Sequence, residues 1–262
     1  SLLIFNGADY VTFDGAHTVS GTTKNLAIRN TSTGGLGEML SAPTVVFWND
    51  AQNNGLKNTI LSARNAYTGV ANKSGSFNTT AGSSLVTGSG ANFQTNLAPG
   101  VILRHASGRV IGVVASIIDQ NNLLLTAPAL VTVGSGSPYY ASIPGVVALV
   151  NSDIASATGN DNNAIDNCDI GDDGSGVLPV IGVYSSGLSS GAVSNSGNSV
   201  TGSNIFNFFT GVGASYGVCM GQNNDTWTVS GNSFYQTSNR TVTSTGAQQY
   251  AIYLGNSLVT AT

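Results

Sequence analysis

Charged residues are scarce in this chain of 262 residues. Only 8% of them are Asp, Glu, Lys or Arg, whereas an ordinary soluble domain has about a quarter. The eight basic residues are scattered and the formal net charge is −4, so the clustered Lys and Arg that bind nucleic acid are missing. Water must therefore bind to the surface mainly through amide and hydroxyl side chains, as is common in proteins that work outside the cell.

Histidine is rare, and long apolar runs are absent. Two histidines at this spacing cannot furnish a Ser/His/Asp arrangement, and no Gly-rich phosphate loop occurs. No apolar run approaches the roughly 18 residues of a membrane span, so we expect none. Residues 1–5 lack the basic flank and the length of a signal peptide, which predicts a mature product or an excised piece.

Helical periodicity is absent as well. Apolar residues at i, i+3, i+4 and i+7 do not recur over any window of about 11 residues that is free of Gly or Pro. Short alternating strands closed by turn residues are present instead, beginning with residues 9–15. With 41% hydrophobic residues the chain can bury a sizeable core. The sequence therefore predicts an all-β protein.

A repeated pattern organises residues 161–254. Each copy follows an Asn-rich lead with two apolar residues that are five apart, and the copies succeed one another after 35 and then 29 residues. The three apolar pairs are Ile165 with Ile170, Val200 with Ile205, and Val229 with Phe234. A period in this range is typical of supersecondary units that stack on one another to share a core.

A second strand-like series runs beside the first, at residues 181–184, 216–219 and 250–253. Residues i and i+2 share one face of a strand. The residues expected to point inward are therefore Ile181, Val183, Tyr216, Val218, Tyr250 and Ile252. Two series with one period and different phases predict a right-handed parallel β-helix, a coil of sheet, in preference to a propeller. The predicted interior column consists of Ile28, Ile60, Ile165, Val200 and Val229.

The Asn-led pattern disappears between about residues 72 and 141. Short strands bounded by turn residues replace it, and removal of about 70 residues brings the coil back into register. We expect a small, barrel-like antiparallel β domain at 72–141, because insertions into repeat proteins map to a loop on one face. Residues 1–71 and 142–262 would then form the two parts of the coil.

Several segments carry a resemblance to a known family: 5–15, 162–168, 182–187 and 225–235. They are similar to segments of the large secreted, surface-attached β-helix proteins of Bacteroidota, which implies an adhesin-like, extracellular protein and says little about chemistry. The insert, at residues 86–93 and 97–100, looks like small β modules of phage tail and bacterial surface proteins.

One acidic cluster stands out, with five carboxylates at Asp161, Asp166, Asp169, Asp172 and Asp173. Paired carboxylates can act as acid and base in glycoside hydrolysis, and the last four could hold Ca²⁺ through oxygen ligands. The spacing lacks the alternation and the bidentate Glu of an EF-hand, and the Gly-His-Gly and Arg-x-Lys signatures of pectin hydrolases do not occur. Asp residues that turn the coil are the plainer interpretation. We predict no catalytic residue, and calcium is the one candidate cofactor.

Aromatic residues on the outside of the second series are the other candidate site. Tyr184, Cys219 and Tyr253 occupy the same position of the repeat on successive turns. Phe47 and Leu149 occupy that position on earlier turns. Exposed aromatics can stack on sugar rings or on a neighbouring subunit, and the alternative is cover by a long loop or by the insert. Phe47, Tyr184 and Tyr253 are therefore the predicted ligand or subunit contacts.

Strand edges at the ends of such a coil would pair with other chains unless they are covered. Head-to-tail contacts that do not close give an open filament. The sequence therefore predicts a non-enzymatic extracellular structural protein, either a surface adhesin or a self-associating fibre subunit. A β-helix that binds or cleaves surface glycans is the alternative, and a phage tail component, which would form a tight trimer, is a third interpretation.

Overall fold

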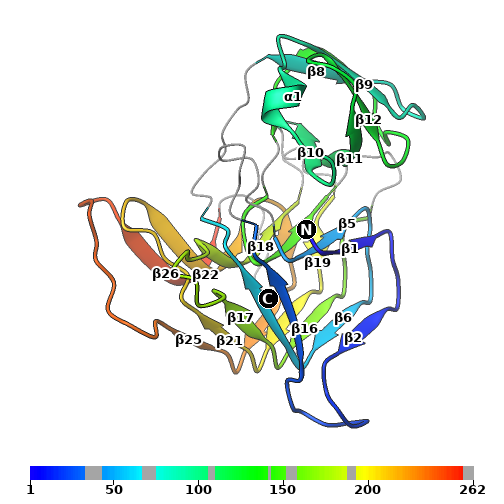
Figure 1. Ribbon diagram of the computed structural model, residues 1–262. Coiled ribbons are helices and arrows are strands. Elements are labelled where there is room, and N and C mark those ends of the chain that lie inside the picture. The colour runs from blue at the N-terminus through cyan, green and yellow to red at the C-terminus, as the bar shows by residue number, and fades with distance from the viewer. Residues whose placement is uncertain are drawn as a thin grey trace.

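The computed structural model describes residues 1–32, 43–66, 75–105, 110–140, 143–151, 158–187 and 193–255. Nearly all regular structure in these ranges is β, since the described helix α1 (Phe93–Asn96) has four residues. No helix in this part of the chain is long and apolar enough to span a membrane. Figure 1 shows a coil of strands with a smaller unit of sheet above it.

The coil consists of stacked parallel sheets, and the largest, sheet 1, has six strands in chain order. They are β1 (Leu3–Asn6), β5 (Val45–Trp48), β15 (Val147–Val150), β18 (Ile181–Ser186), β22 (Ala214–Met220) and β26 (Gln248–Leu254). Each strand pairs in parallel with the next. Parallel neighbours need a crossover between them, and here the crossover is the rest of one turn.

Two further parallel sheets complete each turn. Sheet 2 contains β2 (Thr12–Asp14), β6 (Gly55–Lys57), β16 (Ala164–Asp166), β20 (Ser199–Thr201) and β24 (Thr228–Ser230). Sheet 3 contains β3 (Leu26–Asn30), β7 (Thr59–Ala63), β17 (Asp169–Gly171), β21 (Asn204–Phe206) and β25 (Ser233–Tyr235). A short pair, β19 (Asn195–Ser196) and β23 (Asn224–Asp225), lies between sheets 1 and 2 in the chain. This stacking is that of a parallel β-helix.

Left-handed backbone conformations make the corners of the coil. Between sheets 2 and 3 the φ angles of successive turns are 52° at Asn58, 48° at Asn167, 57° at Gly202 and 66° at Gly231. Only Gly, and to a lesser degree Asn, adopts this conformation at little cost. The recurring Asn and Gly residues of the sequence repeat are therefore explained by the corners.

The interior columns differ from the predicted one. The column of sheet 2 consists of Phe13, Leu56, Ile165, Val200 and Val229. The column of sheet 3 consists of Ile28, Leu61, Ile170, Ile205 and Phe234. Two members of the predicted column were therefore wrong. Ile28 belongs to sheet 3, and Ile60 is half-buried while its neighbour Leu61 takes the place in the core.

Sheet 1 also corrects part of the inward prediction. Val183 and Val218 do face the core, but Ile181 and Tyr216 pack on the outer side with Cys219. The sequence places Gly182 and Gly217 in the positions between them. A Cβ at Gly182 would lie 2.5 Å from Cγ2 of Ile205, so the interior has no room for a side chain there.

Asparagine side chains occupy polar positions inside the coil. Six of the most deeply buried, none more than 2% exposed, are Asn54, Asn160, Asn163, Asn195, Asn198 and Asn224. Each of them hydrogen-bonds to backbone or side-chain groups of its own or a neighbouring turn. Because a buried amide without partners is costly, these side chains require the turns to stack in one register.

The smaller unit is a seven-stranded antiparallel sheet that fits an inserted module. Its order is β13 (Val133–Ser137), β8 (Ser76–Thr79), β9 (Leu85–Ser89), β12 (Asn122–Leu125), β11 (Val110–Ile117), β10 (Ile102–His105) and β14 (Tyr139–Tyr140). The module has a core of its own, in which Tyr139 packs edge-on against Phe77 and Phe93. Both predicted boundaries, at 71/72 and at 141/142, lie outside the described residues.

Candidate functional site

The inserted module packs on the outer face of sheet 1 near its first strands. Val46, Trp48, Ala148 and Val150 of the coil share one buried cluster with Ile102, Val110 and Ile143. The backbone of the module also reaches the coil, because the N–H of Val110 donates to the carbonyl of Asn151 at 3.1 Å. The module thus covers the outer face of sheet 1 at β5 and β15.

Phe47 does not belong to that face, and the prediction that it points outward was wrong. Its side chain is fully buried inside the coil, where it stacks on Phe5 with ring centroids 4.6 Å apart. Its register partner Leu149 lies in the same core. The outward position on this turn is that of Val46, one residue earlier.

Tyr184 and Tyr253 do lie in the outward column, which continues from Val46 and Ala148 through Cys219. Tyr184 is half-buried and packs against the module interface as well as against Cys219. Tyr253 is 38% exposed. Both keep their places as predicted contact residues, and Tyr253 is the more accessible of the two.

Tyr216, Tyr250 and Tyr253 form a tyrosine cluster near the far edge of sheet 1. The rings of Tyr216 and Tyr250 are stacked at 5.4 Å, and Tyr253 lies 5.1 and 5.5 Å from them. Burial, with smaller contributions from Cys219, Tyr253 and Tyr250, raises the pKa of Tyr216, so its hydroxyl stays protonated. The sequence reasoning missed two of these residues because it placed Tyr216 and Tyr250 inside.

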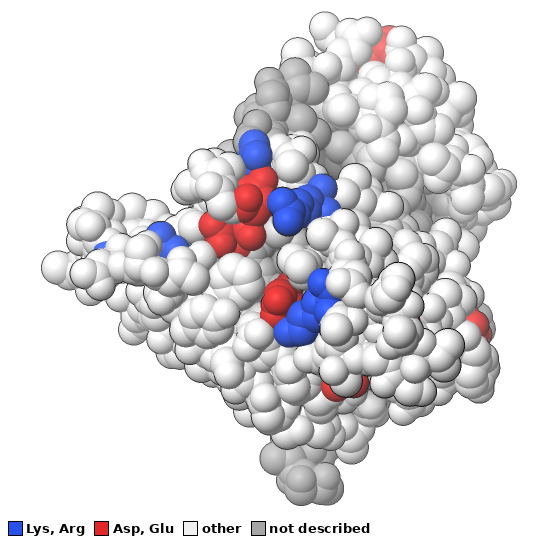
Figure 2. Space-filling model, turned by 60° about the horizontal axis from the view of Figure 1, so that its bottom comes forward, with Lys and Arg blue, Asp and Glu red and all other residues white. Residues whose placement is uncertain are grey.

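The carboxylates of the acidic cluster accept hydrogen bonds from residues of neighbouring turns. Asp166 accepts from the Thr201 hydroxyl at 2.7 Å, and Asp169 accepts from Lys24 and from Asn204. Asp172 and Asp173 lie at the end of β17, where Asn207 donates to the former and Arg64 to the latter, each at 2.7 Å. Figure 2 shows acidic and basic side chains side by side on this face of the coil.

These carboxylates are paired with protein donors. Burial alone would raise the pKa of Asp173, but hydrogen bonds from Ser175 and Arg64 hold it below its ordinary value. Among the described residues no three His, Cys, Asp or Glu side chains gather closely enough to hold a metal ion. Calcium at Asp166, Asp169, Asp172 and Asp173 stays a prediction.

Comparisons with known proteins add little to this picture. No protein-family model and no curated protein matches the chain. Among solved structures it is similar to the tailspike protein gp49 from Pseudomonas phage LKA1, at 12% identity and a TM-score of 0.23. The match covers 79% of this chain and 35% of the tailspike chain, so this chain spans about a third of that protein's length. The assignment to the parallel β-helix class depends on the strand pairing described above.

Proposed function

We propose that this chain is a non-enzymatic structural protein of the cell exterior, either a segment of a large surface adhesin or a subunit of a fibre. It would associate with further β-helix turns through the edge formed by β24, β25 and β26, which we call the open edge. The observation that carries the proposal is the incomplete core at this edge. The origin in Bacteroidota stays a prediction from the sequence resemblance.

The core is less well covered at the open edge than one turn earlier. Val200 and Ile205 are fully buried, whereas their partners Val229 and Phe234 are only half-buried. On β26, Ile252 is 42% and Leu254 55% exposed. Among the strands that the structure describes, none pairs with the outer side of β24, β25 or β26. Such an edge favours pairing with another strand.

Aromatic ladders along the coil axis end at the same edge. Phe206 and Tyr235 are stacked at 5.6 Å with 15° between their planes, and Tyr216 and Tyr250 repeat this on sheet 1. Tyr235 is 42% exposed. A further turn that placed an apolar or aromatic residue in either column would bury these rings and extend both ladders.

Size measurement tests the proposal. Light scattering coupled to size exclusion, with electron microscopy of the same sample, should show assemblies that grow with concentration. The double variant Ile252→Lys, Leu254→Lys should dissociate them, because two charges would have to be desolvated in the contact. Val19→Lys, at a fully exposed position on the first turns, is the matched control. Monomers at every concentration would contradict self-association, and a stable trimer would favour a phage tail component.

Carbohydrate binding or cleavage is the second candidate, and the tyrosine cluster favours it. Three clustered phenol rings on one sheet, of which Tyr253 is exposed and the other two are half-buried, offer both apolar faces and hydroxyl donors, the combination that suits a sugar surface. Binding on a glycan array that Tyr253→Ala abolishes would support it. A loss of viscosity of a polysaccharide solution on incubation would add cleavage.

A further inference from the structure

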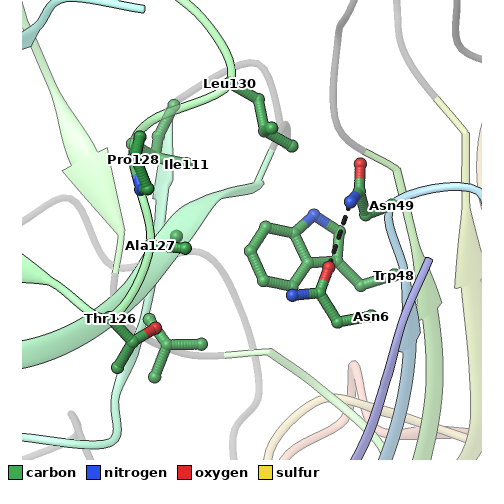
Figure 3. A pocket seen from close by; sticks show the side chains of 10 residues that line it. Asn6, Trp48, Asn49, Ile111, Thr126, Ala127, Pro128 and Leu130 are labelled. Atoms are coloured by element: carbon green, nitrogen blue, oxygen red, sulfur yellow. Dashed lines mark hydrogen bonds between the residues drawn. The ribbon is translucent and has the colours of Figure 1, made fainter. Parts of the chain in front are cut away.

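A cavity of about 100 Å³ lies where the inserted module meets the coil (Figure 3). The coil contributes the ends of β1 and β5, and the module contributes β11 and the segment that follows β12. The lining residues are Asn6, Trp48, Asn49, Ile111, Gly112, Val113, Thr126, Ala127, Pro128 and Leu130. Ligand sites occur preferentially at such junctions between two packed units.

Trp48 is the central residue of this cavity. Figure 3 shows its indole between Asn6 and Asn49 on one side and Ala127 and Pro128 on the other. The side chain is 4% exposed, and its buried Nε1–H group has no hydrogen-bond partner among the described residues. Buried indole N–H groups usually have an acceptor, so this donor is available to an acceptor atom of a ligand.

The polar groups of the wall are neutral. Nδ2 of Asn49 donates to Oδ1 of Asn6 at 3.1 Å, which orients the Asn6 amide and leaves its NH₂ group to donate to a ligand. Thr126 adds a hydroxyl on the module side. The described residues that line the cavity include no Asp, Glu, Lys, Arg or His, so a charged ligand would find no counter-charge among them.

We propose that this cavity binds a neutral sugar, entering as the terminal unit of a glycan. One ring hydroxyl oxygen would accept from Nε1 of Trp48, and others would pair with Asn6 and Thr126. The cavity is smaller than the ~150 Å³ that encloses benzene in an engineered core. Only one edge of the ring enters, and the remainder lies over the exposed residues Ala127 and Pro128.

The site does not depend on the assembly proposed above. The cavity lies beside β1 and β5, at one end of the strand order of sheet 1, and the open edge lies beside β26 at the other. A variant at either place should therefore leave the other property unchanged. Failure of sugar binding and failure of assembly can be told apart in one preparation of protein.

Fluorescence of Trp48 provides a direct readout. The chain has two tryptophans, so Trp227→Phe leaves Trp48 as the single emitter. Titration with the neutral methyl glycosides of glucose, galactose, mannose, N-acetylglucosamine and rhamnose should give a saturable emission shift with at least one of them. Glucuronic acid should give none, because its carboxylate would be desolvated without a partner.

Variants of the wall locate the binding. Asn6→Ala and Thr126→Val should each weaken it about tenfold, the effect of one lost hydrogen bond. Ala127→Leu should abolish it by filling the cavity. Asn239→Ala and Thr241→Val, the same changes at exposed positions on the last turns, should have no effect. The proposal is overturned if no neutral sugar shifts the emission, or if Ala127→Leu leaves the affinity unchanged.

Discussion

Asn163 and Asn198 lie one above the other inside adjacent turns. Oδ1 of Asn198 accepts from both the backbone N–H and the side-chain amide of Asn163, at 2.8 and 3.1 Å. Asn54 repeats the arrangement on Asn163, with distances of 3.1 and 3.0 Å. Each side chain therefore satisfies a backbone donor where the chain leaves one sheet for the next.

Replacement of Asn163 should be costly. Asn163→Ala removes the acceptor of the Asn54 N–H and the donor to the Ala51 carbonyl, both of them buried. We expect the free energy of unfolding in urea to fall by about 3 kcal/mol, the cost of two or three unsatisfied groups. Asn239→Ala, at an exposed position, should change it by less than about 0.5 kcal/mol. Equal effects would show that the ladder contributes nothing specific.

Gly202 tests the corner between sheets 2 and 3. Its φ angle is 57°, and a Cβ there would have no atom nearer than 3.9 Å, so only backbone strain opposes a side chain. Gly202→Ala should lower the free energy of unfolding by about 1 to 2 kcal/mol. Gly202→Asn should cost less, because Asn167 holds this conformation on the preceding turn. Equal urea midpoints for the two variants would contradict this account.

Periodicity predicted the class of fold but assigned some residues to the wrong strand. Leu56 and Leu61 are five apart, like the apolar pairs of the later turns, and the structure places them in those two columns. The prediction used Ile60 instead, because Ile60 follows an Asn and its distance from Ile28 matches the repeat period. The five-residue spacing between the two apolar residues was therefore a better guide than the Asn residues that precede them.

Simple alternation could not predict which residues of sheet 1 point into the core and which point outward. All residues of β5 and β15 are buried, since one side packs in the coil and the other under the module. Hydrophobicity therefore does not distinguish Val46 from Phe47. On β18 and β22 the large core residues Ile205 and Phe234 occupy the space above Gly182 and Gly217, which interrupts the alternation.

The cavity beside Trp48 gave no signal in the sequence. Its two walls are separated by more than sixty residues of chain, and they meet only because the module packs back onto sheet 1. An alignment of repeats finds contacts between equivalent positions on successive turns. A contact between an insert and its host has no period, so it required the structure.

Cys219 should be inert in the folded protein. Both cysteines are free and buried, and desolvation raises the pKa of Cys219 to about 12. At pH 8 its thiolate is about a thousandfold rarer than that of an ordinary thiol, whose pKa is 9.0. Ellman's reagent should therefore detect no fast thiol in the native protein and two after denaturation. Ser238→Cys, at an exposed position, supplies the positive control. Rapid reaction of the native chain would refute the burial of these thiols.

Asp161 should make the protein less stable as the pH rises. Burial raises the pKa of its carboxyl group, and the nearby Asp50 adds to this, although a hydrogen bond from the Ser196 N–H at 2.7 Å opposes the shift. The folded state then holds its proton at pH values where the unfolded state, with a pKa near 4, has lost it. Stability is therefore highest below that value and falls as the pH rises to the folded pKa.

Asp161→Asn separates this effect from the hydrogen bond, because an amide oxygen also accepts from Ser196. The variant should be more stable than the parent at pH 7, and its stability should vary less between pH 4 and 6. Thermal unfolding across that range measures both quantities. Asp119→Asn is the matched control with the opposite sign, because hydrogen bonds from Asn122 and Asn121 lower the pKa of that exposed carboxyl group. Two results together would contradict this account: a parent protein whose stability rises from pH 4 to 6, and an Asp161→Asn variant that is no more stable than the parent. They would show that ionisation of this carboxyl group does not destabilise the folded state.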